Sequence, residues 1–473
     1  MAVLSAPGAG LKEKLRAEFV GMTLQDVIPV PSAVLDLAKL EVNCQRMLDA
    51  TDRLGILWRA HIKSHKTTEL TRLQVGDTRM THVSIIASTV VEAENILPLL
   101  REYQVNGRTV NLLLAFPLFP SAVSRLARFS AELGPASLSI LVDHPDQLAS
   151  AAAITRASGG HAPLVFIKID AEYGRAGVVP SSPACAELVD AALAAEKAGA
   201  CVLHGLYAHA GHSYGSRGNW AAMDYLVKEF EMLSSVAAVV RDKSPDHPLV
   251  LSAGATPTAT TIQHPRVLAG LDGDNESTAT STHKVKSIFN TSKLAGLTLE
   301  VHAGVYPTLD IQQLATHARD SSLMTCKDIA ISIVAEVASV YPGRGADGTT
   351  EALVHAGTLA LGREPVAGKG GDYSGWGVVM SWGAAAEAPG PGPDFPLVHG
   401  GWQVGRISQE HGILAWKGRK EDEVPLRVGD RVRIWPNHSC IAGAGFDWYL
   451  IVDGRNKGRE DEVVDVWPRW RGW

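Results

Sequence analysis

Residues 164–208 read LVFIKIDAEYGRAGVVPSSPACAELVDAALAAEKAGACVLHGLYA, and this stretch decides the fold. It begins with an apolar run at Leu164–Asp170 and ends with another at Val202–Ala208, as expected of strands buried on both faces. Between them, Pro183–Ala198 is Ala-rich with apolar residues at helical spacing, and Gly199 suits a helix stop. The stretch therefore predicts a strand–helix–strand unit of a parallel sheet.

The same alternation continues on both sides of this unit. Trp220–Val240 repeats the helical pattern, whereas Thr256–Lys293 is polar and only partly helical, and is a candidate for a long functional loop. Eight repeats over roughly 250 residues fit a (β/α)₈ TIM-like barrel, with a doubly wound sheet as the competing α/β interpretation. The candidate strands are Leu57–Lys63, His82–Ser88, Val110–Phe116, Leu138–Asp143, Leu164–Asp170, Val202–Ala208, Leu249–Ala253 and Leu297–His302.

The pattern changes after about residue 320. Ile329–Tyr341 alternates and is β-branched, and Gly- and Pro-rich breaks separate the short strand-like runs that follow. This texture is typical of an antiparallel β domain. The sequence thus predicts a barrel over residues 32–315 and a β domain from residues 1–31 and 316–473. The later runs are Gly377–Trp382, Arg431–Trp435 and Trp448–Val452.

Composition excludes several classes of protein. The formal net charge is -6 over 473 residues, which argues against a nucleic-acid or anionic-membrane partner. No run of apolar residues reaches the length of a membrane span, and the first twenty residues do not resemble a secretory signal. The 5 cysteines have no framework spacing, which predicts a reducing, cytoplasmic compartment.

The motif RAHIKSHK closes the first candidate strand, where barrel enzymes carry catalytic residues. Its Lys63 could form a Schiff base with an aldehyde cofactor if burial or positive charge lowers the lysine pKa. His61 and His65 flank Lys63. Taken alone, however, the pattern favours a basic surface turn with two hydrogen-bonded histidines.

Two further motifs follow the fifth and sixth strands. In DAEYGRAGV, two glycines bracket Arg175, whose guanidinium could bind a phenolate or carboxylate, although an arginine that caps a turn explains it equally. In GLYAHAGHSY, Tyr207 and His209 share one face of the strand because strand side chains alternate. A buried structural role explains one of these aromatic residues but not the whole cluster.

Loops after the seventh and eighth barrel strands often bind phosphate. Ser252, Gly254 and Thr256 follow the seventh strand, where small residues permit close backbone approach. Gly304 and Tyr306 follow the eighth and are candidates for the other half of a phosphate cup. An ordinary Ser/Thr-rich loop and an ordinary strand-to-helix turn are the alternatives.

A last motif, PNHSC, lies in the β domain. His438 and Cys440 are two residues apart, so at a strand end they would point the same way and share one Zn²⁺ ion. Two protein ligands leave positions open for water and substrate, as a catalytic metal requires. In most proteins an isolated His-x-Cys arises by chance, so this interpretation depends on its context.

The context comes from a family resemblance. Taken in order, the motifs resemble the family of D-serine dehydratases, D-threonine aldolases and related enzymes, within the alanine-racemase-like fold type III of pyridoxal-phosphate proteins. The matching segments span about residues 30–452 and are RAHIKSHKT, STVVEAE, NLLLAFPL, KIDAEYGRAGV, GLYAHAGHSY, SAGATPT, EVHAGVYPTLDIQQL, ISQEHGIL and PNHSC.

The resemblance implies a barrel plus a β domain, a homodimer, and pyridoxal 5′-phosphate (PLP) bound to Lys63. Arg175 matches the arginine near the cofactor's phenolic oxygen, and one of Tyr207 and His209 lines its ring, with the choice left open. The segments that would bind the phosphate contain Ser252, Gly254, Thr256, Gly304 and Tyr306. Extra residues at Gly343–Thr350 and Pro389–Pro396 predict longer loops.

The metal pair separates the branches, because the dehydratases resemble His-x-Cys and the aldolases His-x-Asp. His438 and Cys440 therefore favour zinc-dependent elimination of D-serine to pyruvate and ammonia, and also of D-threonine to 2-oxobutyrate. Retro-aldol cleavage of D-threonine and dehydration of D-3-hydroxyaspartate remain alternatives. A racemase needs a second base and no metal, and non-catalytic cofactor-binding relatives resemble only the barrel.

Overall fold

A computed structural model describes residues 9–79, 81–269, 276–366, 373–387 and 399–473. The chain divides into two compact units. Gln45–Gly304 and Arg471–Trp473 form one unit, and Met1–Cys44 and Val305–Trp470 form the other. This division differs from the one expected from the sequence, because residues 32–44 and 305–315 belong to the second unit rather than to the barrel.

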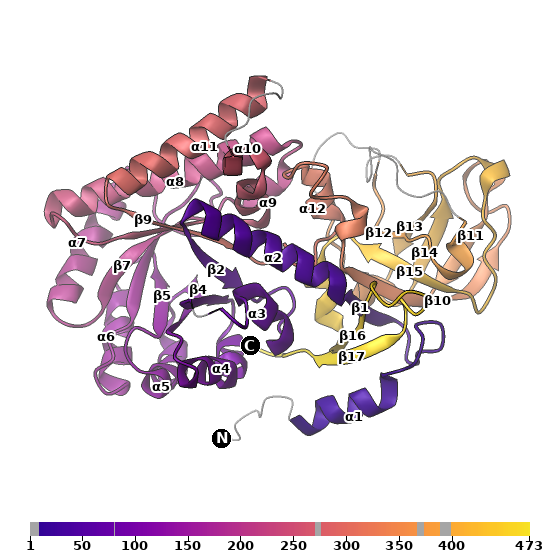
Figure 1. Ribbon diagram of the computed structural model, residues 1–473, viewed down its shortest axis with the longest axis horizontal. Coiled ribbons are helices and arrows are strands. Elements are labelled where there is room, and N and C mark those ends of the chain that lie inside the picture. Colours follow the sequence, from indigo (N-terminus) through magenta and orange to yellow (C-terminus); the bar gives the residue numbers. More distant parts are fainter. Residues whose placement is uncertain (1–8, 80, 270–275, 367–372, 388–398) are drawn as a thin grey trace. The chain divides into compact units, whose positions relative to one another are not determined.

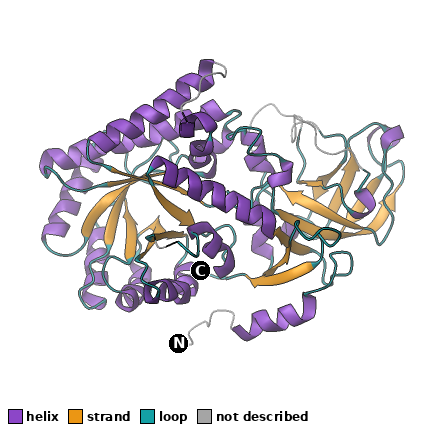
Figure 2. Ribbon diagram, in the orientation of Figure 1, coloured by secondary structure: helices purple, strands orange, loops and turns teal. Residues whose placement is uncertain are grey.

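The first unit is a closed parallel barrel of eight strands, β2 to β9 in chain order (Figure 1). Every expected strand is present, which confirms the barrel and excludes the doubly wound sheet. Helices surround the strands (Figure 2), so the strands are buried on both faces. The strands are β2 (Leu57–His61), β3 (Val83–Ala87), β4 (Val110–Pro117), β5 (Leu138–Val142), β6 (Leu164–Lys168), β7 (Val202–Tyr207), β8 (Val250–Ala253) and β9 (Thr298–Ala303).

Strand β2 is the least apolar because it places a charge inside the barrel. Arg59 is 2% exposed and Glu300 1% exposed, and Arg59 Nε donates to Glu300 Oε1 at 2.7 Å. Arg59 Nη1 also donates to Asn111 Oδ1 at 2.7 Å. The charge is therefore both paired and hydrogen-bonded, as a buried ion requires.

Side-chain caps set the starts of several barrel helices. Thr67, Thr89 and Ser182 accept hydrogen bonds from backbone N–H groups three residues ahead, as N-cap residues do. The helices expected near 183–198 and 220–240 are present as α7 and α8. The helices are α3 (Thr68–Val75), α4 (Val90–Val105), α5 (Val123–Leu133), α6 (Gln147–Ala157), α7 (Pro183–Lys197), α8 (Asn219–Lys243), α9 (Thr256–Thr260), α10 (Pro265–Ala269) and α11 (Glu276–Leu294).

The segment Thr256–Lys293 corrects an expectation, because its described part is mostly helical rather than a long loop. Helix α11 packs against α8, with Phe230 and Phe289 in edge-to-face contact at 5.3 Å. The rest of its buried face consists largely of Ser and Thr, including Thr278 and Ser281. Small hydroxyl residues give no hydrophobic period, so the pattern could not reveal this helix.

The second unit is built on a nine-stranded sheet in the order β11-β14-β13-β12-β15-β10-β1-β16-β17. Its neighbouring strands are antiparallel except β1 and β16, which confirms an antiparallel β domain. Its strands are β1 (Ser32–Asp36), β10 (Ile331–Tyr341), β11 (Glu351–Val354), β12 (Gly377–Val379), β13 (Trp402–Ile407), β14 (Gly412–Trp416), β15 (Arg431–Pro436), β16 (Trp448–Val452) and β17 (Val463–Pro468).

Short helices complete this unit, and α2 crosses from it into the barrel unit. The expected loop Gly343–Thr350 connects β10 to β11, whereas Pro389–Pro396 lies outside the described residues. No helix in the described part of the chain has the length and hydropathy of a membrane span. The helices are α1 (Ala9–Phe19), α2 (Leu37–Leu54), α12 (Ile311–Thr316), α13 (Thr358–Leu361) and α14 (Ser439–Ala442).

Candidate active site

Lys63 lies in the turn between β2 and α3, at the carboxyl end of the barrel strands. The turn is fixed by His65, which is fully buried and contacts Thr67 Oγ1 at 3.1 Å and Gln74 Oε1 at 2.9 Å. His65 is therefore a structural residue. His61, in contrast, lies beside the lysine, with its Nδ1 3.5 Å from the Lys63 backbone nitrogen.

Three imidazoles lie within the electrostatic reach of Lys63: the buried His61 and His302, and the half-buried His209. Burial holds the pKa of each well below its ordinary value, and the positive charge of Lys63 lowers each further. All three rings are therefore neutral at neutral pH. The amine of Lys63 lies half-buried beside them.

An aromatic stack lies beside this amine. The Tyr207 and His302 rings are 4.2 Å apart and 10° from parallel, and the His209 and His302 rings are 6.4 Å apart. Both Tyr207 and His209 thus face His302, as strand alternation predicts. His209 Nδ1 lies 2.7 Å from the Gly254 carbonyl oxygen, so this nitrogen carries the proton and donates it.

The structure brings Ser252, Gly254 and Gly304 to the same site. Ser252 Oγ is 3.0 Å from His302 Nδ1. Gly254 has φ +151°, and a Cβ there would collide with the His302 carbonyl oxygen. A Cβ on Gly304 would lie 3.2 Å from the His61 carbonyl oxygen. Both glycines are therefore required for close backbone approach at the ends of β8 and β9.

The remaining candidates divide between the units. Thr256 begins α9 and is buried. Arg175 lies exposed in the loop after β6, and its charge lowers the pKa of His209, which places the guanidinium near the site. Tyr306 belongs to the other unit, where it is fully buried and hydrogen-bonds to Cys44.

Three charged or polar residues of the site were not assigned from the sequence: Lys168, Glu229 and His302. Lys168 ends β6 with its Nζ 5.2 Å from the Tyr207 ring centroid, and burial lowers its pKa to about 8. Burial raises the pKa of Glu229 on α8 to about 7. Each could have been noticed as a charged or polar residue within a buried apolar pattern.

The second unit contains the candidate metal pair. His438 and Cys440 follow β15 in a turn and at the start of α14, so strand alternation does not explain their proximity, yet their side chains hydrogen-bond to each other. Asp310 Oδ2 lies 3.2 Å from His438 Nδ1 and accepts from the Ser439 backbone N–H at 2.9 Å. Burial lowers the pKa of His438, but Cys440 and Asp310 outweigh it and raise the pKa well above its ordinary value.

This pair fits a metal in kind, because imidazole and thiolate suit Zn²⁺ and a carboxylate on the other imidazole nitrogen is a common orienting partner. Among the described residues, no three His, Cys, Asp or Glu side chains converge as metal ligands. Within the described chain, the protein therefore offers at most two ligands here.

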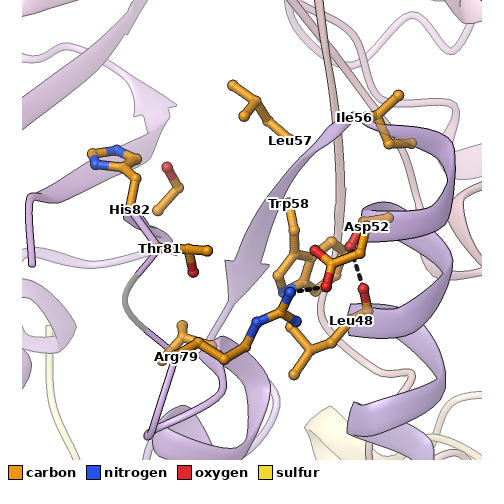
Figure 3. Close-up of a pocket in the computed structure, with 11 residues that line it drawn as sticks. Leu48, Asp52, Ile56, Leu57, Trp58, Arg79, Thr81 and His82 are labelled. Carbon is orange, nitrogen blue, oxygen red and sulfur yellow. Dashed lines mark hydrogen bonds and ion pairs between the residues drawn. The ribbon is translucent and has the colours of Figure 1, made fainter.

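A pocket of about 130 Å³ lies at the opposite end of the barrel, at the amino ends of β2 and β3. Figure 3 shows Arg79 paired with Asp52 beside Trp58, with His82 on the facing segment. Burial lowers the pKa of His82, so this side chain is neutral. This end of a barrel ordinarily serves stability rather than catalysis, so Lys63 marks the candidate active site.

Comparison with solved structures defines the class. An alanine-racemase-like protein from Idiomarina loihiensis superimposes with a TM-score of 0.68 at 23% identity, over 95% of this chain and 99% of that one. D-threo-3-hydroxyaspartate dehydratase from Delftia sp. HT23 superimposes with a TM-score of 0.68 at 25% identity, over 95% and 100%. A cysteine-to-alanine variant of that dehydratase is described in the metal-free form. The fold is the alanine-racemase-like fold type III of PLP proteins.

Sequence relatives narrow the class. Residues 330–452 match the family model described as "Putative serine dehydratase domain". D-serine dehydratase from Schizosaccharomyces pombe is 36% identical over 98% of this chain and 96% of its own. D-serine dehydratase from Saccharomyces cerevisiae is 30% identical over 97% and 99%. The chain belongs to the D-serine dehydratase family.

Proposed function

We propose that this protein is a carbon–oxygen lyase that eliminates water from D-serine to give pyruvate and ammonia, and converts D-threonine to 2-oxobutyrate. One observation carries the proposal: the Lys63 amine stands among three neutral imidazoles at the carboxyl end of a barrel whose chain is 36% identical to a D-serine dehydratase over 98% of its length.

We propose PLP as the cofactor, because the residues at this end of the barrel fit it. Lys63 supplies an amine for the aldehyde, and Arg175 a cation near it. Gly254 and Gly304 leave room for close approach of backbone to a phosphate, next to Ser252 and Thr256. Tyr207 or His209 would line the ring, and Tyr306 is the further phosphate candidate. When bound, PLP supplies an electron sink that makes the substrate Cα–H acidic.

The chain's own residues then perform the proton transfer and the positioning. The Lys63 amine, in its unprotonated form, takes the α-proton of the substrate as the general base. His61, His209 and His302 are neutral, so they offer no positive charge that would draw the substrate carboxylate away from a cationic partner such as Arg175. The buried stack of Tyr207 and His302 excludes water from this side of the site.

We further propose that His438 and Cys440 hold a Zn²⁺ ion. When bound, zinc supplies a Lewis acid that stabilises the departing β-hydroxyl. Asp310 would keep His438 in place, since its carboxylate contacts Nδ1 and anchors the turn through the Ser439 amide. The metal-free form described for a cysteine variant of the related dehydratase supports a metal at the matching kind of residue.

A homodimer and a cytoplasmic location complete the proposal. The resemblance supports the dimer, and the lack of any disulfide among Cys44, Cys185, Cys201, Cys326 and Cys440 supports a reducing compartment. The molecular mass in solution, compared with the 50.4 kDa of one chain, tests the dimer.

Product analysis tests the function directly. Purified protein is given D-serine, L-serine and D-threonine, before and after EDTA treatment and with zinc restored. We expect pyruvate and 2-oxobutyrate from the D-substrates alone, lost with EDTA and recovered with zinc. Glycine from D-threonine would instead establish an aldolase.

D-3-hydroxyaspartate is the second candidate substrate. A D-threo-3-hydroxyaspartate dehydratase is 28% identical over 94% of this chain, which is below the 36% of the D-serine relative. Oxaloacetate formation from D-3-hydroxyaspartate, with a higher kcat/KM than for D-serine, would favour this alternative.

A further inference from the structure

Glu229 is a charged residue on the buried side of α8. Its side chain is 1% exposed, and it lies among Leu226, Phe230 and Leu233, which are fully buried on the same helix. A carboxylate in such surroundings is costly unless hydrogen bonds compensate it. The groups around the Glu229 carboxylate therefore indicate its role.

Those partners are loop groups of the candidate active site. Glu229 Oε1 accepts from the Ala210 backbone N–H at 2.7 Å. The Gly254 backbone N–H and the Thr258 hydroxyl lie close enough to the carboxylate to lower its pKa. Glu229 thus bonds to the loop after β7 and lies beside the loop after β8.

His209 completes this connection. It immediately precedes Ala210, and its Nδ1–H donates to the Gly254 carbonyl at 2.7 Å. The Gly254 carbonyl therefore accepts from His209, and its N–H lies near the Glu229 carboxylate. This arrangement fixes the orientation of the His209 ring beside His302.

An ion pair with a nearby cation explains the burial of Glu229 less well than the hydrogen bond to the loop does. Lys168 is the cation that faces it, from β6, but the Lys168 Nζ donates to the Ile169 carbonyl at 3.1 Å and lies 5.2 Å from the Tyr207 ring centroid. The positive charges of Lys63 and Arg175 act on the neighbouring His209. The hydrogen bond from the Ala210 N–H is therefore the direct contact of the carboxylate, in the loop that carries His209.

We propose that Glu229 is a positioning residue of the active site, which holds the His209 loop and the Gly254 loop in the arrangement that binds the cofactor. The proposal rests on the proposed function, because it assumes that these loops contact PLP. The ionised carboxylate is the better acceptor for backbone N–H groups, so cofactor affinity should fall as Glu229 takes up a proton.

The test uses Glu229→Gln, which keeps the shape of the side chain, with Glu231→Gln as the matched control on the exposed face of the same helix. The dissociation constant of PLP is measured on cofactor-stripped full-length protein from pH 6 to pH 9, and the Tm is measured at pH 8. We expect Glu229→Gln to weaken PLP binding about tenfold at pH 8, the effect of losing a hydrogen bond to a charged acceptor.

We also expect wild-type affinity to fall below pH 7 relative to the Glu229→Gln variant, whose Tm at pH 8 equals or exceeds that of the wild type. Unchanged PLP binding would overturn the proposal. So would a lowered Tm or an unfolded variant, because either result assigns Glu229 to stability alone. A wild-type protein that binds PLP but releases no pyruvate from D-serine would refute the proposed function and leave the role of Glu229 standing.

Discussion

At the scale of single residues, the turn between β2 and α3 gives its two histidines different tasks. His65 bonds at both ring nitrogens and holds the turn. His61 makes two long contacts, at 3.5 Å to the Lys63 amide and at 3.4 Å to Ser88 Oγ. His65 therefore keeps the turn rigid, whereas His61 is held only loosely beside Lys63. Of the three side chains, the Lys63 amine is the one suited to react with an aldehyde.

Replacement of Lys63 is the first test at this scale. Lys63→Ala should lose the absorbance of the covalently bound cofactor and nearly all turnover, because the amine proposed to form the link is removed. Lys63→Arg is the control, since it keeps the charge but not the nucleophile, and it should fail equally. Absorption spectra and pyruvate release measure the two effects. A Lys63→Arg enzyme with the wild-type spectrum would contradict the assignment.

Cys440 provides the second residue-scale prediction. Cys440→Ala removes one of the two proposed ligands, so the variant should keep its PLP spectrum, lose bound zinc and lose elimination. Metal content by mass spectrometry and product release check this. Cys326→Ala, a thiol outside the pair, should retain both. A fully active, zinc-free Cys440→Ala enzyme would show that the metal plays no part.

The reactive and cofactor-binding residues of the site could be predicted from the sequence more fully than the contacts between them. Lys63, Tyr207, His209 and Gly254 could be singled out, because strand ends and glycines carry recognisable patterns. The contact between Ser252 and His302 joins residues 50 positions apart, and no local pattern encodes it. For the same reason the role of Glu229 could not be read from α8 alone.

At the scale of elements, strand β2 and strand β9 are joined inside the barrel by Arg59 and Glu300. The pair brings charges into the buried interior of the barrel, where Arg59 also bonds to Asn111. Removing one partner leaves the other charged and unpaired, which is far more costly than removing both.

We therefore expect Arg59→Met to lower the free energy of unfolding by about 3–5 kcal/mol, the usual cost of breaking a buried pair from one side. The double variant Arg59→Met/Glu300→Met should recover much of that loss. Urea unfolding followed by circular dichroism measures both. If the double variant lost as much stability as Arg59→Met and Glu300→Met lose separately when added together, the two residues would be acting independently.

Elements with a strong period could be predicted, and those without one could not. Seven of the eight barrel strands and the helices α7 and α8 have clear apolar patterns, and β2 was recognised despite its Arg59 and His61. Helix α11 was missed because Thr278 and Ser281 meet α8 through hydrogen bonds to Asn219 and Asp224, which leave no hydrophobic period. The stability of such a helix comes from tertiary packing, which a local sequence pattern does not reveal.

At the scale of the whole molecule, the two units are built from interleaved segments of chain. Strand β1 lies in the antiparallel sheet because it pairs with β10 and β16, some 300 to 400 residues later. A hydrophobic run at Ser32–Asp36 suits a barrel strand equally well, so the boundary of the units depends on pairing partners rather than on local pattern.

Global stability should depend on pH through two buried groups of the barrel. Burial raises the pKa of Glu229 from 4.5 to about 7, so the folded state holds a proton that the unfolded state has released. The contribution of Glu229 to the free energy of unfolding is therefore greatest below pH 4.5 and declines as the pH rises to 7. Burial lowers the pKa of Lys168 from 10.5 to about 8, so stability from this group is present above pH 10.5 and is lost as the pH falls to 8.

Between pH 7 and 8 both groups are charged and their burial costs the most. In this window we expect the free energy of unfolding of Glu229→Gln to exceed that of the wild type by about 3 kcal/mol at most, which is the free-energy equivalent of the shift in the pKa of Glu229. The variant should also lack the decline in stability that the wild type shows between pH 4.5 and 7. Urea unfolding at a series of pH values measures this. An identical decline in the variant would mean that Glu229 ionises in the folded protein as it does in water. A more stable Glu229→Gln variant would show that the wild-type protein loses stability by burying this charge and that the charge serves the organisation of the site.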